Sequence, residues 1–302
     1  MLFKTMHILL TNDDGIGSSF LRILAEELKA AGHQLSIAAP AGEQSWISRA
    51  MSRRREVSVI EVDGWPGNAW AIDGTPTDCI NIALGHLVKA QRHPEMLQRE
   101  LHPEEENVSA ISERPLSVDV VISGINVGMN CSLPFVLASG TIAGALEAAF
   151  WGLPAIAISQ YLSQEMFIEI AESKGSKLPG VVEQSLRRGS RRIASLLESI
   201  VNEGRPDCLA AALEPINKQE AIVHNINFPY PCEEDSPMLY TEPGYIRIGT
   251  LYKEVEPGKY GFHFTGGTPM EGKALTDREC VFEMQAISYS RLDYKMLGCT
   301  EG

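Results

Sequence analysis

The chain has 302 residues, of which 44% are hydrophobic and 22% are charged, and its formal net charge is −13. This length and composition predict a soluble globular protein with a sizeable core, organised as one large domain or as one domain plus an appendage. The acidic excess argues against a protein that binds a nucleic-acid duplex or an anionic membrane, because both ligands need a basic surface.

The first forty residues predict a β-α-β unit. Residues 7–16 read HILLTNDDGI, an apolar run that predicts a buried strand and stops at two adjacent aspartates. Residues 20–33 carry leucine and alanine at helical spacing and a glycine placed to end a helix, and residues 34–40, QLSIAAP, predict a short strand closed by proline. A crossover of this kind places its two strands in parallel.

The alternation of strands and helices continues along the chain. We expect strands at 70–74, 119–126, 154–160 and 222–231, and helices at 75–88, 139–150 and about 184–204. This order predicts an α/β fold with a Rossmann-like, doubly wound, mainly parallel sheet and a C-terminal β-hairpin extension. Thr75, Pro76 and Asp78 form a capping-box-like helix start, so we assign them a structural and not a catalytic role.

Two regions depart from this pattern. Residues 89–117 are polar and rich in charge and proline, so we expect an exposed insertion or a helical excursion there, between one helix and the next strand. From about Pro231 onward, short aromatic and glycine-punctuated runs such as YIRIGTLY and KYGFHFTGG predict hairpins outside the main sheet. We therefore divide the chain into an α/β domain at 1–230 and an extension at 231–302. The extension either holds subunits together or packs as a second sheet on its own chain.

Location and thiol state are also indicated by the sequence. No apolar stretch approaches the roughly 18 to 20 uncharged residues of a membrane span, and the aspartates come too early for a signal peptide, so we expect a cytoplasmic protein. The six cysteines are scattered without a CxxC pair, which favours free thiols over a zinc site or a disulfide framework.

Polar clusters follow three of the predicted strands. They are Asn12-Asp13-Asp14-Gly15, Gly42-Glu43-Gln44-Ser45 and Gly124-Ile125-Asn126. Ligands of open parallel sheets bind beyond the carboxyl ends of the strands, so we expect these clusters to converge. Adjacent carboxylates repel each other unless a cation lies between them, and oxygen donors suit Mg²⁺ or Mn²⁺. The alternative for Asp13 and Asp14 is a helix cap and a turn.

A fourth cluster predicts an anion site. Ser139, Gly140 and Thr141 open a helix of small residues, whose first backbone N–H groups are free to bind an anion. The alternative is an ordinary serine-capped helix. A metal site and an anion site in one crevice together indicate phosphate-ester chemistry.

These motifs identify a family resemblance. The segments ILLTNDDGI, AAPAGEQSWIS, AIDGTPTDCINIAL, DVVISGINVGMN, SGTIAGALEAAFWGLPAIAIS and HNINFP resemble the SurE survival proteins, which are metal-dependent 5′/3′-nucleotidases of the cytoplasm. The resemblance implies one divalent cation, Mg²⁺ or Mn²⁺, in each subunit. Its implied ligands are Asp13, Asp14, Ser45 and Asn126.

The resemblance also implies how the substrate and the subunits are held. Phosphate contacts are implied near Asn12 and Asn130 and at the Ser139-Gly140-Thr141 turn. A homodimer or homotetramer is implied, in which C-terminal hairpins exchange or pack between subunits. The chain departs from the family pattern at 43–46, where Glu-Gln-Ser-Trp replaces a basic, glycine-containing stretch, and at Ala138, where a tyrosine is common.

The predicted function is therefore the hydrolysis of nucleoside 5′- or 3′-monophosphates to nucleoside and phosphate. Asp13 and Asp14 are the catalytic candidates, and either can act as the general base. His7 precedes the core of the first strand and His224 lies within another strand, and both favour packing or capping roles over catalysis. A haloacid-dehalogenase-type phosphatase would need an Asp-x-Asp spacing that this chain lacks. A non-catalytic nucleotide-binding module is the remaining alternative.

Overall fold

The computed structural model describes residues 4–88, 118–172, 178–215, 221–264, 266–270, 272 and 274–296. The insertion predicted at 89–117 therefore lies entirely outside the described residues. Within the described segments, no helix combines the length and the hydropathy needed to cross a membrane.

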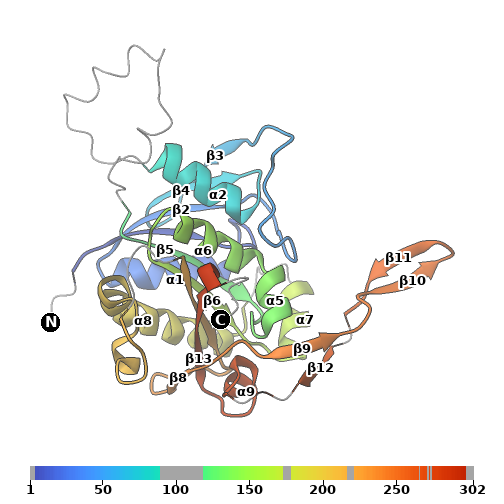
Figure 1. The fold of residues 1–302 in the computed structure, drawn as a ribbon. Coiled ribbons are helices and arrows are strands. Elements are labelled where there is room, and N and C mark those ends of the chain that lie inside the picture. The colour runs from blue at the N-terminus through green and yellow to red at the C-terminus, as the bar shows by residue number, and fades with distance from the viewer. Residues whose placement is uncertain are drawn as a thin grey trace.

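The described residues form a nine-stranded sheet in the order β3-β4-β2-β1-β5-β6-β7-β13-β8 (Figure 1). The strands are β1 (His7–Thr11), β2 (Gln34–Pro40), β3 (Val59–Glu61), β4 (Asn68–Ile72), β5 (Val120–Val127), β6 (Ala155–Gln160), β7 (Ile222–Phe228), β8 (Met238–Tyr240) and β13 (Ile287–Asp293). The six strands from β4 to β7 in this order are parallel. β3 and β13 pair antiparallel with their inner neighbours.

The predicted α/β class and mainly parallel sheet are confirmed, with helices on both faces. The helices are α1 (Ser19–Ala30), α2 (Pro76–Ile82), η1 (Ala83–Leu87), α5 (Leu133–Ala138), α6 (Gly140–Phe150), α7 (Gln164–Glu172), α8 (Gly180–Glu203), η4 (Asp207–Leu209), α9 (Asp277–Phe282) and η5 (Tyr294–Met296). One core cluster joins α1 and α8 to alternate residues of β1 such as Ile8, and the other joins α2 and α6 to Leu9. Successive side chains of β1 point to opposite faces of the sheet, so they pack into two separate cores.

Helix boundaries follow local chemistry. The Ser18 hydroxyl accepts a hydrogen bond from the Leu21 N–H and caps α1, so neither Asp13 nor Asp14 is that cap. The capping box predicted for α2 is confirmed, because Thr75 and Asp78 each accept a hydrogen bond from the other's backbone N–H.

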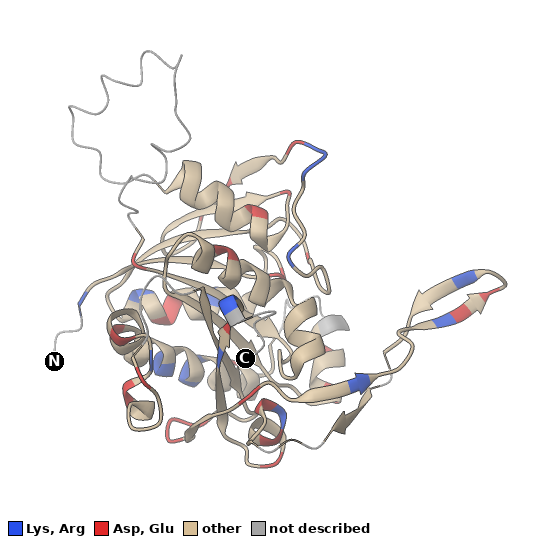
Figure 2. Ribbon diagram, in the orientation of Figure 1, with Lys and Arg blue, Asp and Glu red and all other residues tan. Residues whose placement is uncertain are grey.

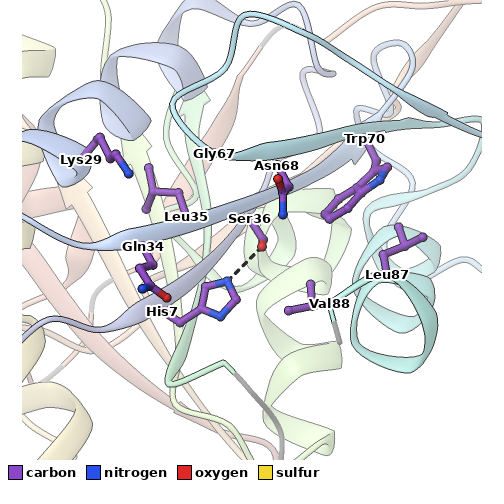
Figure 3. A pocket seen from close by; sticks show the side chains of 10 residues that line it. All are labelled: His7, Lys29, Gln34, Leu35, Ser36, Gly67, Asn68, Trp70, Leu87 and Val88. Atoms are coloured by element: carbon purple, nitrogen blue, oxygen red, sulfur yellow. Dashed lines mark hydrogen bonds between the residues drawn. The ribbon is translucent and has the colours of Figure 1, made fainter. Parts of the chain in front are cut away.

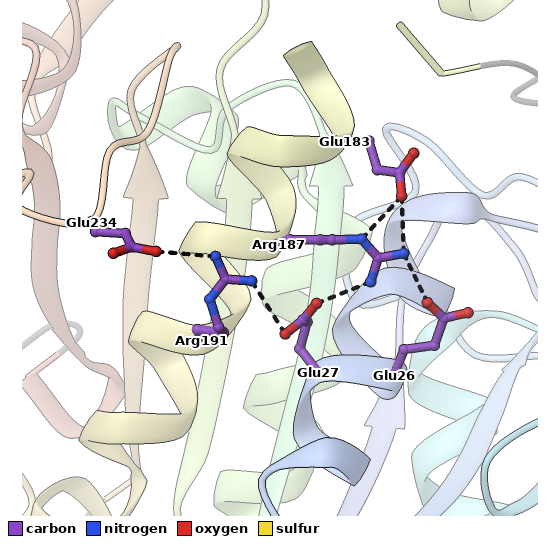
Figure 4. Close-up of polar contacts among 6 residues, drawn as sticks. All are labelled: Glu26, Glu27, Glu183, Arg187, Arg191 and Glu234. Atoms are coloured by element: carbon purple, nitrogen blue, oxygen red, sulfur yellow. Dashed lines mark hydrogen bonds and ion pairs between the residues drawn. The ribbon is translucent and has the colours of Figure 1, made fainter. Parts of the chain in front are cut away.

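Helices α1 and α8 are also joined by ion pairs (Figure 4). The Arg187 guanidinium lies 2.9 Å from Glu27 and Glu183 and 3.1 Å from Glu26, and Arg191 bridges Glu27 and Glu234. These carboxylates raise the pKa of Arg187, with the hydrogen bond to Glu27 as the largest cause. Figure 2 shows that α8 carries basic residues beside acidic ones, so much of its positive charge is paired within the chain.

The hairpins predicted after Pro231 are confirmed, but part of this region joins the main sheet. β9 (Tyr245–Ile248) pairs with β12 (Gly267–Met270), and β10 (Tyr252–Glu256) pairs with β11 (Lys259–Phe262). The β10-β11 hairpin, which we call the arm, projects from the body of the molecule (Figure 1). β8 and β13 extend the nine-stranded sheet, which the sequence analysis did not predict. The division at residue 230 remains a prediction.

The thiol prediction is confirmed for the cysteines that the structure describes. Cys79, Cys131, Cys208, Cys232 and Cys280 are free, and all but Cys208 are buried.

Candidate active site

The candidate site lies where the order of the parallel strands reverses. The chain leaves β1 toward β2 on one side, while β5 pairs with the other side of β1. In doubly wound sheets, ligands usually bind at such a reversal, beyond the carboxyl ends of the strands. β1 leads directly into Asn12, Asp13 and Asp14, and β5 contains Asn126.

Asp13 lies against the N-terminus of α6. Its side chain is 4% exposed, and its carboxylate accepts a hydrogen bond of 2.5 Å from the Thr141 hydroxyl. A Cβ added to Gly140 would lie 2.8 Å from the Asp13 Cβ and 3.1 Å from the Gln44 carbonyl oxygen. Only glycine therefore allows α6 to begin this close to the carboxylate.

Asp14 points toward the end of β5. Its carboxylate accepts a hydrogen bond of 3.1 Å from the Val127 N–H, one residue beyond Asn126. This contact brings the two strand ends together, as the sequence analysis predicted for the clusters at 12–15 and 124–126.

Burial makes both carboxylates costly to ionise. Burial is the largest cause that raises the Asp13 pKa to about 6, and it also raises the Asp14 pKa well above its usual value, with the charge of Asp13 as the second cause. The charge of Glu43 raises both pKa values further. A pair of buried carboxyls with raised pKa values and a third carboxylate nearby is typical of a site that holds a positive charge.

The loop after β2 lies over Asp13. The Gln44 N–H donates to the Asp13 carbonyl oxygen at 2.7 Å, and the Ser45 hydroxyl donates to Glu43 at 2.6 Å. Trp46 has a backbone φ of 58°, which is the left-handed region that glycine adopts easily and a bulky residue rarely does. The predicted cluster at 42–45 therefore reaches the site through Gln44, and Ser45 is exposed beside it.

The residues present fit a hard cation better than a soft one. Among the residues that the structure describes, no three His, Cys, Asp or Glu side chains form a metal-binding cluster. A cation here would take the carboxylates of Asp13 and Asp14 and neutral oxygens of Ser45 and Asn126, a set that suits Mg²⁺ or Mn²⁺. The Asn126 amide nitrogen donates to the Gly128 carbonyl oxygen at 3.0 Å, and this leaves its Oδ1 as the donor for a cation.

The predicted phosphate contacts make specific hydrogen bonds in the structure. The Ser139 hydroxyl caps α6 by accepting from the Ile142 N–H, and the Thr141 hydroxyl donates to Asp13. The Asn12 amide bonds both backbone groups of Gly15 and shapes the turn. Phosphate binding by Asn12, Ser139, Gly140 and Thr141 stays a prediction.

Asn130 belongs to a buried amide network that the sequence analysis missed. Its side chain donates to the Ser159 hydroxyl at 2.8 Å, its N–H donates to Asn227, and its carbonyl oxygen accepts from Asn225. The Asn225 Oδ1 is buried and has no hydrogen-bond partner. The signal available in the sequence was two asparagines at alternate positions of an otherwise apolar strand.

Two histidines lie away from Asp13 and Asp14. His224 is buried and its Nδ1 lies 2.7 Å from the Tyr289 hydroxyl. His7 begins β1, at the amino ends of the parallel strands. It lines a cavity of about 470 Å³ together with Lys29, Ser36 and Trp70 (Figure 3). This cavity lies at the amino ends of the strands, so it is separate from Asp13 and Asp14.

Comparisons with known proteins agree on one family. The family model described as Survival protein SurE matches residues 8–98 and 106–249. A protein of Methanocella arvoryzae named 5′-nucleotidase SurE is 26% identical over 299 residues, which cover 98% of this chain and 95% of that protein. A protein of Caulobacter vibrioides with the same name is 33% identical over 61% of this chain and 60% of its own length.

The fold is also that of a solved member of the family. The crystal structure of the SurE protein from Aquifex aeolicus superposes with a TM-score of 0.62 at 20% identity, and the match covers 96% of both chains. At this level of identity the superposition supports the fold and carries no residue roles.

Proposed function

The chain belongs to the SurE family, and on that basis we propose that it is a nucleotidase that releases phosphate from nucleoside monophosphates. The observation that carries this proposal is the buried pair of Asp13 and Asp14 at the strand-order reversal, beside the N-terminus of α6. Both nucleoside 5′- and 3′-monophosphates belong to the proposed substrate class. The site also requires a divalent cation under this proposal.

The cation is proposed to bind Asp13, Asp14, Ser45 and Asn126. Magnesium or manganese would supply positive charge that offsets the two carboxylates and polarises the phosphate ester. The raised pKa values of both aspartates support this arrangement, because a cation between them would offset the free-energy cost of ionising them.

Under this proposal, groups of the protein orient the phosphate and accept the proton. The N-terminus of α6 lies against Asp13, so its free backbone N–H groups and its partial positive charge would orient the phosphate and stabilise the charge of the transition state. A water attacks phosphorus in line with the ester oxygen, and the P–O ester bond breaks. One of the two aspartates accepts a proton of that water and later releases it to solvent, and the departing nucleoside oxygen takes a proton from solvent and leaves as the free hydroxyl.

The direct test is phosphate release from nucleoside 5′- and 3′-monophosphates, measured with Mg²⁺, with Mn²⁺ and with EDTA. We expect turnover with a divalent cation and none with EDTA. Asp14→Asn should lower turnover by several orders of magnitude, while the exposed Asp63→Asn serves as the matched control. Turnover that persists in EDTA would contradict the metal requirement.

The same experiment separates an enzyme from a binding module. A non-catalytic nucleotide-binding module would bind nucleoside monophosphate in equilibrium dialysis and release no phosphate under any of these conditions. That result would replace the proposed activity with binding.

We further propose a cytoplasmic homodimer or homotetramer. The arm supports the oligomer, because Tyr252, Val255 and Tyr260 are 57 to 65% exposed on a hairpin that projects from the body. Apolar side chains this exposed on a projecting element are typical of a surface that another chain covers. Light scattering of the full chain measures the subunit number.

A further inference from the structure

Four aromatic side chains from three segments meet beside the candidate active site. The Trp46 ring centroid lies 5.8 Å from Phe135 of α5, 5.1 Å from Phe262 of the arm and 6.0 Å from Phe264 just beyond it. Phe135 and Phe264 also contact each other at 5.5 Å. We call these four residues the aromatic rim.

The aromatic rim is not a covered core. Trp46 is 42% exposed, Phe262 52% and Phe264 40%, although Trp46 contacts both phenylalanines. Rings that are held by neighbours and still open to solvent gain free energy when a flat apolar group covers them. The aromatic rim is therefore built as a contact surface and not as an interior cluster.

Two of the three segments that carry the aromatic rim, those of Trp46 and Phe135, lead directly into residues of the site. Trp46 directly follows Ser45, and consecutive Cα atoms are about 3.8 Å apart. Phe135 lies in α5, which ends at Ala138, immediately before the serine that caps α6. The Ser48 N–H donates to the Ala138 carbonyl oxygen at 2.9 Å and ties these two segments together.

The backbone at Trp46 supports a functional placement of its ring. A φ of 58° is unfavourable for a large side chain, and such conformations persist where surrounding contacts hold them. Here the holding contacts are the three phenylalanine rings. The strained backbone at Trp46 thus places its indole ring next to Ser45.

We propose that the aromatic rim binds the nucleobase of the substrate, so that a base is recognised as a flat aromatic surface and not through its particular hydrogen-bonding groups. This inference rests on the proposed function and names the part of the nucleotide that this site recognises. A nucleoside monophosphate separates its phosphate from its base by one sugar ring, so a phosphate at α6 places the base near Trp46. Stacking tolerates every base, so we expect a strong preference for nucleotides over base-free esters and little discrimination among bases.

The kinetic test compares two substrates that differ only in the base. Adenosine 5′-monophosphate and ribose 5-phosphate share the sugar and the phosphate ester, and kcat/KM is measured for both with Mn²⁺. We expect Phe264→Ala to lower the kcat/KM for adenosine 5′-monophosphate, relative to that for ribose 5-phosphate, about tenfold, which is the usual effect of losing one stacking contact. Phe167→Ala is the matched control, because Phe167 is an exposed aromatic residue of α7 and lies outside both the aromatic rim and the arm.

Two kinetic outcomes overturn the inference and leave the proposed function standing. The first is a wild-type protein that hydrolyses both substrates with equal kcat/KM. The second is a Phe264→Ala variant in which both kcat/KM values fall together, because the aromatic rim then shapes the site or a subunit contact without binding the base. A wild-type protein that hydrolyses neither substrate contradicts the proposed function instead.

A binding measurement tests the aromatic rim without turnover. Adenosine 5′-monophosphate should quench the tryptophan fluorescence of the wild-type protein, and ribose 5-phosphate should not. Trp46→Phe should remove this quenching while it keeps an aromatic ring in the aromatic rim. Equal quenching by adenosine 5′-monophosphate in wild type and Trp46→Phe would contradict the inference, whether or not the protein is an enzyme.

Discussion

Replacement of Asp13 by asparagine should stabilise the protein in the absence of metal. Burial raises the pKa of this carboxyl from 3.8 to about 6 on folding. A carboxyl with a raised pKa contributes stability that is fully present below its unfolded pKa and is lost as pH rises through its folded pKa. About two pKa units correspond to about 3 kcal/mol at pH 8, where both states are ionised. Asparagine stays neutral and keeps an oxygen that accepts from the Thr141 hydroxyl.

The expected difference therefore depends on pH and on metal. In EDTA the free energy of unfolding of Asp13→Asn should exceed that of wild type by under ~1 kcal/mol near pH 4 and by about 3 kcal/mol at pH 8. Mn²⁺ at 100 times its dissociation constant should stabilise wild type by about 3 kcal/mol and leave the variant unchanged.

Urea unfolding at both pH values, with EDTA and with Mn²⁺, measures these differences, and Asp63→Asn is the control for loss of an exposed carboxylate. The reasoning is refuted if Asp13→Asn is less stable than wild type at pH 8 in EDTA. A purely structural carboxylate predicts that opposite sign, with a loss of roughly 0.5 to 2 kcal/mol.

Three further predictions concern other parts of the molecule. Burial lowers the pKa of His224 to about 3, so the stability that the neutral imidazole contributes is present above its unfolded pKa of 6.5 and is lost as pH falls. Between pH 7 and pH 5, the free energy of unfolding of His224→Gln should therefore fall by about 2 kcal/mol less than that of wild type, measured by urea unfolding. Equal pH slopes for the two proteins would contradict this. Gly140→Ala should abolish phosphate release, because the added Cβ would lie 2.8 Å from Asp13, whereas Gly85→Ala meets nothing closer than 3.9 Å and should retain activity; an active Gly140→Ala would show that this close approach is dispensable. Replacement of residues 253–261 by an Asn-Gly turn removes the arm tip but keeps β8 and β13, and light scattering should then detect a smaller species; a wild-type protein that is monomeric at micromolar concentration would rule out the oligomer.

Local patterns in the sequence were sufficient for the central α/β elements. The apolar run at 7–11, the helical spacing that follows it and the capping box at Thr75 each depend on neighbours within a few residues, and the structure confirms all three. Strand β13 was missed because the contacts that bury it are not local. Its serines Ser288 and Ser290 look solvent-exposed in the sequence, yet both are buried and bonded to the Thr241 hydroxyl at 2.8 Å, a partner that no short window contains.

The candidate site divides in the same way. The sequence alone determined that Asp13 and Asp14 follow a buried strand and that a small-residue helix begins at Ser139, because residue type and spacing record both facts. Only the tertiary structure decided that Gly140 brings that helix against Asp13, and that Trp46 meets phenylalanines more than eighty residues away. The physical reason is that helix and strand preferences act through local backbone geometry, whereas desolvation, charge proximity and ring contacts depend on which distant segments the folded sheet places side by side.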